Sequence, residues 1–279
     1  ETKQSIGDKL IDVKFSGLSW KGNEGVYYSS YDKPKGSELS AKTEQHKLYF
    51  HKLGTNQSED VLVFGDKERR RYVGGNVSED NHYLFITAAN STSGNELYVQ
   101  DLTQLNGEIK SIHSGFEYDV RVLDNVGSKL YLITNLGAPN KRIVTVDVNA
   151  SSVSKWKDCV AETEQVLSPS IGAGFIFANY MKDAVSVVKQ FDYNGKLVRE
   201  IQLPGLGTAT GFSGKSEDTA LYFSFTNYVT PTTTYKFLPV EGKSSIYVQP
   251  KVDFVSVVRT LSVPPPATSL TLSDLLSTV

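Results

Sequence analysis

Few residues in this sequence are placed to do covalent chemistry. Nucleophilic hydrolysis needs a serine or cysteine, a general base and an orienting carboxylate, and the nucleophile usually lies on a sharp turn of the pattern G-x-S-x-G. The nearest match, Gly211-Phe212-Ser213-Gly214, lacks that spacing and leads into another strand-like segment, so we expect Ser213 to be structural. Cys159, the single cysteine, lies beside Trp156 in a candidate strand, where a buried structural thiol is expected. We therefore predict no catalytic residue.

Metal and cofactor chemistry also lacks a suitable set of residues. The histidines lie on different segments or on turns, without the spacing of a metal site: His46, His51, His82 and His113. No phosphate-binding glycine loop occurs. Three acidic residues near strand starts could serve a five-bladed glycosidase if they converged on a central channel: Asp12, Asp119 and Glu164. We predict neither a metal nor a cofactor.

The elements that would position any site are repeated β-strands. A glycine-rich stretch, 203–214, precedes two strands rich in aromatic and β-branched residues, 220–228 and 233–237. The same order recurs along the chain, with second strands beginning near residues 25, 82, 129, 174 and 220. First strands are expected to begin near residues 13, 72, 120, 165 and 208, third strands near 48, 97, 143, 187 and 234, and fourth strands near 61, 109, 156, 197 and 245. Four antiparallel strands repeated about every 45 to 57 residues are typical of β-propeller blades. We predict an all-β fold, a β-propeller of about five four-stranded blades.

The repeats define one domain, residues 1–254, and a different C-terminal segment. Blades are expected over residues 8–66, 67–116, 117–161, 162–205 and 206–252. Residues 255–279 include three consecutive prolines, which cannot donate to a sheet, so we expect an irregular tail there. The polar excursion 31–45 is long for a connection between neighbouring strands, and the sequence leaves open whether it is functional or disordered.

Composition argues against several classes of partner. The formal net charge of −2 and the pI near 6.2 give no reason to expect nucleic acid or an anionic membrane. The cluster 67–71 is better explained as a solvated turn between blades than as a basic recognition patch. No apolar run approaches the roughly 18 residues of a membrane span, and no signal peptide is recognisable. We expect a soluble protein of the cytoplasm, or of the periplasm if a signal peptide has been removed.

Several separate motifs in the same order make the sequence similar to a known family. They are Lys14-Phe15-Ser16 with Trp20, the run Tyr27 to Tyr31, His46 to Thr55 with Gln57 to Asp60, Thr134 to Arg142, and the stretch Leu203 to Tyr228. Over about residues 8–254 the chain resembles the propeller of the prolyl oligopeptidase (prolyl endopeptidase) family.

The resemblance implies a fold, partners and a role. Family members carry a seven-bladed propeller inserted into an α/β-hydrolase domain, whose Ser-Asp-His triad cleaves short peptides after proline, and the propeller keeps folded proteins out. This chain would correspond to the last five blades, without the hydrolase domain, and would be inactive alone. Its partners would be that domain and short proline-containing peptides.

By motif, the resemblance also assigns individual residues. Phe15 would correspond to an aromatic side chain lining an outer substrate subsite, although its alternation with Val13 is equally compatible with a core position. The segment with Ser37, Ser40 and Gln45 would match a mobile loop near the domain interface. The tail departs from the family pattern, for which a truncated or frameshifted gene product is our hypothesis. A free-standing propeller that serves as a peptide or protein interaction platform is the alternative function.

Overall fold

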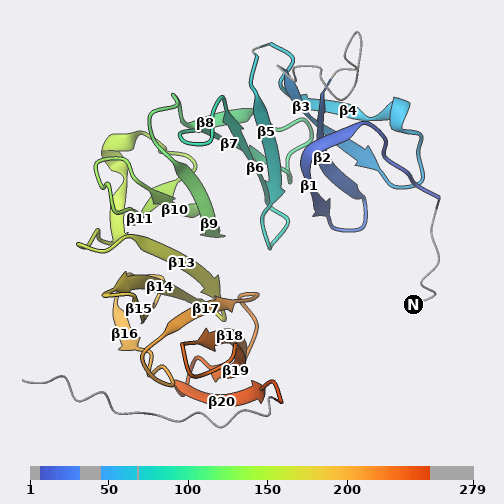
Figure 1. The fold of residues 1–279 in the computed structure, drawn as a ribbon. Helices are drawn as coiled ribbons and strands as arrows, with labels where there is room; N and C mark the ends of the chain where they lie inside the picture. The colour runs from blue at the N-terminus through green and yellow to red at the C-terminus, as the bar shows by residue number, and fades with distance from the viewer. Residues whose placement is uncertain (1–6, 32–44, 68, 252–279) are drawn as a thin grey trace, which may run out of the picture.

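The chain folds as five four-stranded antiparallel sheets arranged around an open arc (Figure 1). The computed structural model describes residues 7–31, 45–67 and 69–251. Ser37, Ser40, most of the excursion 31–45 and the tail 255–279 therefore lie outside the described residues. Within the described part, the only helical segments are two short 3-10 turns, Gln57–Glu59 and Val153–Lys155. No helix there is long and apolar enough to cross a membrane.

Each sheet is a meander in which the strands pair in chain order. Sheet A comprises β1 (Val13–Lys21), β2 (Gly25–Tyr31), β3 (His46–Lys52) and β4 (Val61–Phe64). Sheet B comprises β5 (Tyr72–Val77), β6 (Tyr83–Ala89), β7 (Glu96–Asp101) and β8 (Ile109–His113). Sheet C comprises β9 (Val120–Val126), β10 (Lys129–Thr134), β11 (Arg142–Asp147) and β12 (Lys157–Val160). Sheet D comprises β13 (Leu167–Gly172), β14 (Phe175–Lys182), β15 (Val185–Phe191) and β16 (Leu197–Glu200). Sheet E comprises β17 (Thr208–Ser213), β18 (Leu221–Thr226), β19 (Thr233–Leu238) and β20 (Lys243–Val248).

The predicted all-β propeller architecture of five four-stranded blades is confirmed. Every strand begins within two residues of its expected position. The strand positions were predictable because both faces of the middle strands are buried against neighbouring sheets. Such strands appear in the sequence as continuous apolar runs. In β10, Leu130 and Leu132 pack against sheet B, whereas Tyr131 packs against sheet D.

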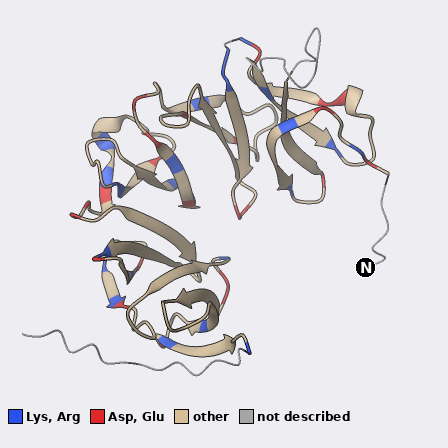
Figure 2. Ribbon diagram, viewed as in Figure 1, with Lys and Arg blue, Asp and Glu red and all other residues tan. Residues whose placement is uncertain are grey.

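The first strands of neighbouring sheets lie against one another on the inner side of the arc. β1 contacts β5, β9 contacts β13, and β13 contacts β17. In Figure 1 the arrowheads of β5, β9 and β13 point into the inside of the arc. In the view of Figure 2, lysine and arginine residues are interspersed with acidic residues around the arc.

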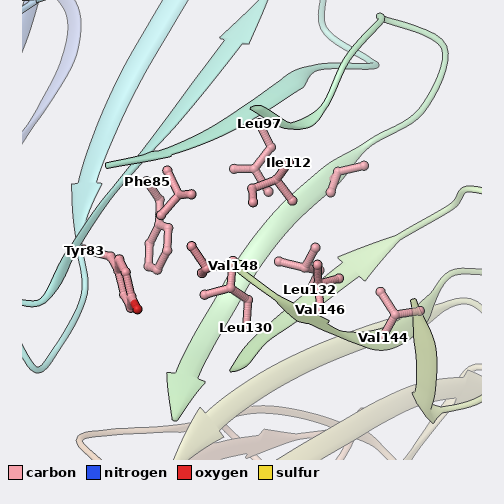
Figure 3. Close-up of a cluster of buried hydrophobic side chains, with 11 residues drawn as sticks. Tyr83, Phe85, Leu97, Ile112, Leu130, Leu132, Val144, Val146 and Val148 are labelled. Carbon is pink, nitrogen blue, oxygen red and sulfur yellow. The ribbon is translucent and has the colours of Figure 1, made fainter. Parts of the chain in front are cut away.

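Apolar side chains fill the space between neighbouring sheets. Between sheets B and C, Tyr83, Phe85 and Leu97 meet Leu130 and Leu132, all buried (Figure 3). Similar clusters lie between A and B, C and D, and D and E, the last containing five buried phenylalanines. Burying each large apolar side chain contributes about 1.5–3 kcal/mol, so these layers supply most of the force that holds adjacent sheets together.

A hydrogen bond repeated at each junction fixes how one sheet meets the next. The acceptor lies near the start of the third strand of one sheet. The donor is the backbone N–H of the first or second residue in the first strand of the next sheet. The side-chain acceptors are His46 Nδ1 for Val73 at 2.9 Å, Asn95 Oδ1 for Val120 at 3.0 Å, and Ser186 Oγ for Ala209 at 3.0 Å. Between sheets C and D the acceptor is the Asn140 carbonyl, bound by Leu167 N at 2.9 Å. These junction bonds align the first strands along the inside of the arc.

Candidate functional site

The arc has two faces, defined by the direction of the strands. The first strands begin on one face, which we call the starting face, and the antiparallel second strands end there. Contacts between adjacent sheets on this face include Tyr31 Oη to the Arg71 carbonyl at 2.8 Å and Gly94 N to Asp119 Oδ1 at 2.7 Å. The turns between first and second strands lie on the opposite face.

Phe15 is an exposed aromatic residue on the starting face. Its side chain is 64% exposed, so the alternative that placed it in the core is wrong. The pairing register of β1 with β2 shifts between Val13 and Leu18, and Phe15 has φ 53° within this bulge. The ring lies edge-on to Tyr31 at 6.3 Å and to Tyr72 at 6.1 Å. The bulge explains why simple alternation failed here: the extra residues re-aim the side chain outward.

Gln45 anchors the end of the excursion 31–45. Its Nε2 donates to the Gly65 carbonyl at 2.9 Å, which ties it to the end of sheet A. The other two predicted loop residues, Ser37 and Ser40, lie outside the described residues.

The histidines are placed differently from what we expected. His46 and His51 share strand β3, and together with His113 they are buried in strands rather than lying on turns. His46 donates through Nε2 to the Lys14 carbonyl at 3.1 Å while Nδ1 accepts from Val73. Burial lowers the pKa of His46 to about 4, which keeps the ring neutral at ordinary pH.

A buried Asp-His pair occurs in sheet A, but its surroundings are structural. His51 Nδ1 lies 2.7 Å from Asp60 Oδ1, and Tyr28 donates to the other oxygen of Asp60 at 2.7 Å. The second ring nitrogen of His51 faces Asp8 at 3.8 Å rather than a hydroxyl. Asp8 also accepts from Gly54 N at 2.8 Å, so the group fastens the segment before β1 onto the sheet.

No nucleophile is activated in the described part of the chain. No serine hydroxyl is bonded to a histidine ring there, and Ser213 ends β17 paired with Tyr222. Burial raises the pKa of the half-buried Cys159 thiol, which disfavours the thiolate. In residues 7–31, 45–67 and 69–251, no group of three or more His, Cys, Asp or Glu residues could hold a metal. The acidic residues considered for a glycosidase precede three different sheets: Asp12, Asp119 and Glu164.

The basic cluster 67–71 is not simply a solvated turn. Arg70 binds Glu96 of sheet B through two hydrogen bonds, Nε to Oε2 at 2.6 Å and Nη2 to Oε1 at 3.0 Å. Its guanidinium also lies 5.1 Å from the centre of the Phe116 ring. Arg70 is therefore part of the junction between the first two sheets.

On the opposite face, the turn Ser78–Asn81 connects sheet B to three other sheets, and we call it the hub turn. Glu79 accepts from Ser216 N of sheet E at 3.0 Å, Asp80 accepts from Asn125 Nδ2 of sheet C at 2.9 Å, and Asn81 accepts from Gly22 N of sheet A at 3.0 Å. A cavity of 340 Å³ lies beside it, lined by inner strands of sheets B, C and D. The hub turn thus spans the centre of the arc on this face.

Sequence reasoning missed the junction acceptors and the hub turn. A signal for the former exists, because a polar residue stands at the start of the third strand in several repeats, as His46, Asn95 and Ser186 do. The hub turn has no comparable signal, since its partners are 45 to 137 residues away and depend on the curvature of the whole arc.

Comparison with known proteins agrees with this geometry. Residues 1–250 match the family described as "Prolyl oligopeptidase, N-terminal beta-propeller domain". A prolyl endopeptidase of Elizabethkingia meningoseptica is 52% identical over 256 residues, covering 91% of this chain and 36% of the relative. A prolyl endopeptidase of Dictyostelium discoideum is 29% identical, covering 89% of this chain and 36% of the relative. The chain thus spans about a third of the length of these relatives.

Solved structures give the same picture of the fold. A structure from a study of two prolyl endopeptidases, concerned with inter-domain dynamics in catalysis and specificity, superposes with a TM-score of 0.79 at 27% identity. The superposed region covers 88% of this chain and 36% of the chain in that structure. Prolyl oligopeptidase B from Galerina marginata, bound to a 25-residue macrocyclization substrate, superposes with a TM-score of 0.77 at 22% identity, covering 87% and 35%.

Proposed function

This chain belongs to the prolyl oligopeptidase N-terminal β-propeller family, and from that premise we propose that it is the substrate-gating propeller portion of a serine peptidase that cleaves short peptides after proline. Its partner in this role is an α/β-hydrolase catalytic domain, which in the full-length relatives belongs to the same polypeptide. In this role the blades of the chain form the surface that the peptide meets, and the catalytic groups belong to the hydrolase domain.

The contrast between the two faces of the arc carries this proposal. The opposite face is crossed at its centre by the hub turn, bonded to sheets A, C and E. The starting face presents the exposed ring of Phe15 beside Tyr31 and Tyr72. A peptide held between a catalytic domain and the starting face would meet an aromatic surface, and the hub turn would hinder the entry of a folded protein from the opposite face.

Phe15 is proposed as a wall of an outer substrate subsite. Its exposure and its edge-on contacts with two tyrosines suit an apolar side chain or a proline ring of a peptide. Ser37, Ser40 and Gln45 are proposed to belong to a loop at the interface with the catalytic domain. The anchoring of Gln45 to Gly65 would then define where that loop returns to the sheet.

The absence of catalytic groups is tested with the purified chain. We expect no hydrolysis of a short post-proline reporter peptide by this chain at its confirmed intact mass. A serine-reactive probe should also leave the chain unlabelled. Turnover that co-purifies with the chain and is blocked by a probe attached to it would refute the proposal.

A free-standing interaction platform is the second candidate function. The hub turn favours it, because its bonds to sheets A, C and E hold these sheets and sheet B together within this chain. Exposed apolar side chains at the two ends of the arc count against it, since Trp20 on β1 is 55% exposed and Tyr247 on β20 is 60% exposed. The oligomeric state of the chain separates the two candidates.

A further inference from the structure

A small polar cavity lies on the starting face where sheets B and C meet. Its volume is 260 Å³. It is lined by Thr92, Asn95, Asp119, Arg121, Ile133, Thr134 and Lys141. These residues come from the start of β9, from the end of β10 and from the connections that join second to third strands in the two sheets. The cavity therefore shares the face that carries Phe15.

Two basic side chains in this cavity have no ion-pair partner among residues 7–31, 45–67 and 69–251. They are Arg121, an exposed residue on β9, and Lys141, which is half-buried just before β11. Other arginines nearby are neutralised: Arg70 by Glu96 and Arg142 by Asp158 at 2.9 Å. The cavity thus holds two cations that the fold does not use for pairing.

The single carboxylate in the cavity is already engaged by the backbone. Asp119 Oδ1 accepts from Gly94 N at 2.7 Å, and the Asp119 N–H donates to Asn135 at 2.8 Å. Asn95 is likewise occupied, with its amide group bonded to Val120 N and to the Val120 carbonyl. The side chains left to meet a ligand are the two cations, the hydroxyl of Thr92 and the apolar wall of Ile133. The Thr134 hydroxyl accepts from Leu136 N at 3.0 Å and keeps its own proton to donate.

The backbone at Lys141 is unusual for a lysine. Its φ is 70°, in the left-handed region, which costs a residue with a side chain on the order of 1 kcal/mol or more relative to glycine. The turn is held in place, because Lys141 N donates to Ala138 O at 2.7 Å and Asn140 Nδ2 donates to the Thr163 carbonyl at 3.0 Å. The fixed turn therefore determines where the Lys141 side chain leaves the backbone, at the edge of the cavity.

We propose that Arg121 and Lys141 form a site for a carboxylate group of the peptide that the starting face receives. Two cations beside hydroxyl groups match the charge and the acceptors of one carboxylate. The engaged Asp119 keeps the site at a net charge of about +1, which suits a monoanion better than a dianionic phosphate. The carboxylate comes from a peptide C-terminus or from an Asp or Glu side chain. That the ligand is a peptide rests on the function proposed above; the carboxylate site itself does not.

The site is tested by NMR titration at low salt of the full chain, which carries Trp20→Lys and Tyr247→Lys at the two ends of the arc in every sample to keep it monomeric. Backbone amides of the lining residues are followed. The first probe is N-acetylglycine, with its amide as the uncharged counterpart. Two proline peptides distinguish the sources: acetyl-Gly-Pro-Ala with a free C-terminus, and acetyl-Glu-Gly-Pro-amide with only a side-chain carboxylate. Acetyl-Gly-Pro-Ala-amide serves as their neutral reference.

We expect carboxylate probes to shift the amides around Arg121 and Lys141, with affinity about tenfold above that of their amides. The substitutions Arg121→Gln with Lys141→Gln should abolish the difference. The matched control, Lys155→Gln with Lys196→Gln, removes the same charge from exposed positions on sheets C and D and should preserve it.

The possible outcomes separate this inference from the function proposed above. Equal binding of N-acetylglycine and its amide, or equal losses in the two double variants, would overturn the carboxylate site. Binding of N-acetylglycine that depends on Arg121 and Lys141 would support the site even if neither acidic proline peptide bound better than the neutral one. That last result would instead count against the peptide-receiving role of the starting face.

Discussion

His46 shows how one side chain can determine the pH range in which two sheets stay together. The ring is fully buried, stacks on Tyr31 with ring centres 4.1 Å apart, and bridges the Lys14 carbonyl and the Val73 N–H. This arrangement requires a neutral imidazole, because a proton on Nδ1 would remove the acceptor for Val73. Burial lowers the pKa of His46 from 6.5 to about 4.

Acid should therefore weaken the junction between sheets A and B. Below pH 6.5 the unfolded chain binds a proton at His46 while the folded chain does not, so the free energy of unfolding falls as the pH drops towards 4 and levels off below it. The loss at this one group is up to about 3 kcal/mol. Urea unfolding at a series of pH values measures it.

The comparison variant is His46→Asn, whose amide oxygen can still accept from Val73 but does not titrate. Its free energy of unfolding should fall less between pH 6.5 and 4 than that of the native chain. His113, whose pKa burial also lowers, remains in both proteins and contributes equally. The same pH dependence in native and variant chains would contradict this role for His46.

At the scale of single residues, the sequence indicated which side chains have no catalytic role, but it did not indicate which side chains are exposed. It indicated that Ser213 and Cys159 are structural, but it could not decide whether Phe15 faces the core or solvent. That choice depends on a bulge between Val13 and Leu18, which no pattern of alternation encodes. Arg121 and Lys141 were missed because nothing local distinguishes a lysine or arginine with a partner from one without.

At the scale of elements, a glycine in one inner strand determines how closely sheets D and E approach, whereas a glycine in another inner strand has free space beside it. A Cβ atom at Gly172 on β13 would lie 2.8 Å from the backbone nitrogen of Gly214 and 2.8 Å from Leu221 Cδ2, both in or beside sheet E. A Cβ at Gly17 on β1 would meet nothing within 4 Å. Neither glycine has a positive φ, so the two positions differ in space rather than in backbone strain.

Gly172→Ala should destabilise the chain by about 1–3 kcal/mol, because overpacking forces sheets D and E apart. Gly17→Ala, the matched control, should change the free energy of unfolding by less than about 1 kcal/mol. Urea unfolding of the two variants at one pH gives the comparison. Equal changes in the free energy of unfolding for the two variants would show that the closeness of Gly172 to sheet E does not cause the destabilisation.

Strand positions could be predicted from sequence because each middle strand is a short apolar run bounded by turn residues, as in β10. The wrong expectation concerned histidines. We expected them on turns or in different repeats, yet His46 and His51 are buried in one strand, where the His46 ring bonds main-chain groups and His51 Nδ1 bonds the Asp60 carboxylate. Burial of a polar ring depends on those partners, which come from 9 to 32 residues away.

At the scale of the whole molecule, the arc ends in two sheets with exposed apolar side chains. On β1, Leu18 and Trp20 are 60% and 55% exposed, and on β20, Ile246 and Tyr247 are 56% and 60% exposed. The inner strands of sheets between these ends bury apolar side chains against a neighbour, as Val120 on β9 and Leu167 on β13 do. Exposed strands of this kind favour pairing with another chain.

The chain on its own should therefore self-associate at micromolar concentration. Replacing one apolar residue at each end, Trp20→Lys with Tyr247→Lys, should shift it towards monomer, as measured by sedimentation velocity. Lys155→Gln, away from both ends, is the control. A native chain that is monomeric and melts cooperatively would instead favour a free-standing interaction platform.

The central claim, that this chain is the gating propeller of a prolyl peptidase, is tested most directly in a chimera. Residues 7–251 would replace the matching segment of the Elizabethkingia meningoseptica prolyl endopeptidase, which is 52% identical to this chain. Folding is verified by cooperative melting and by labelling with a serine-reactive probe. The quantity measured is hydrolysis of a short proline peptide, compared with hydrolysis of the same sequence displayed in a folded protein.

We predict cleavage of the short peptide, no cleavage of the folded protein, and a severalfold higher KM with Phe15→Ala at nearly unchanged kcat. The KM should rise because Phe15 supplies binding area rather than a reacting group. A folded, probe-labelled chimera that cleaves both substrates alike, or neither, would contradict the account.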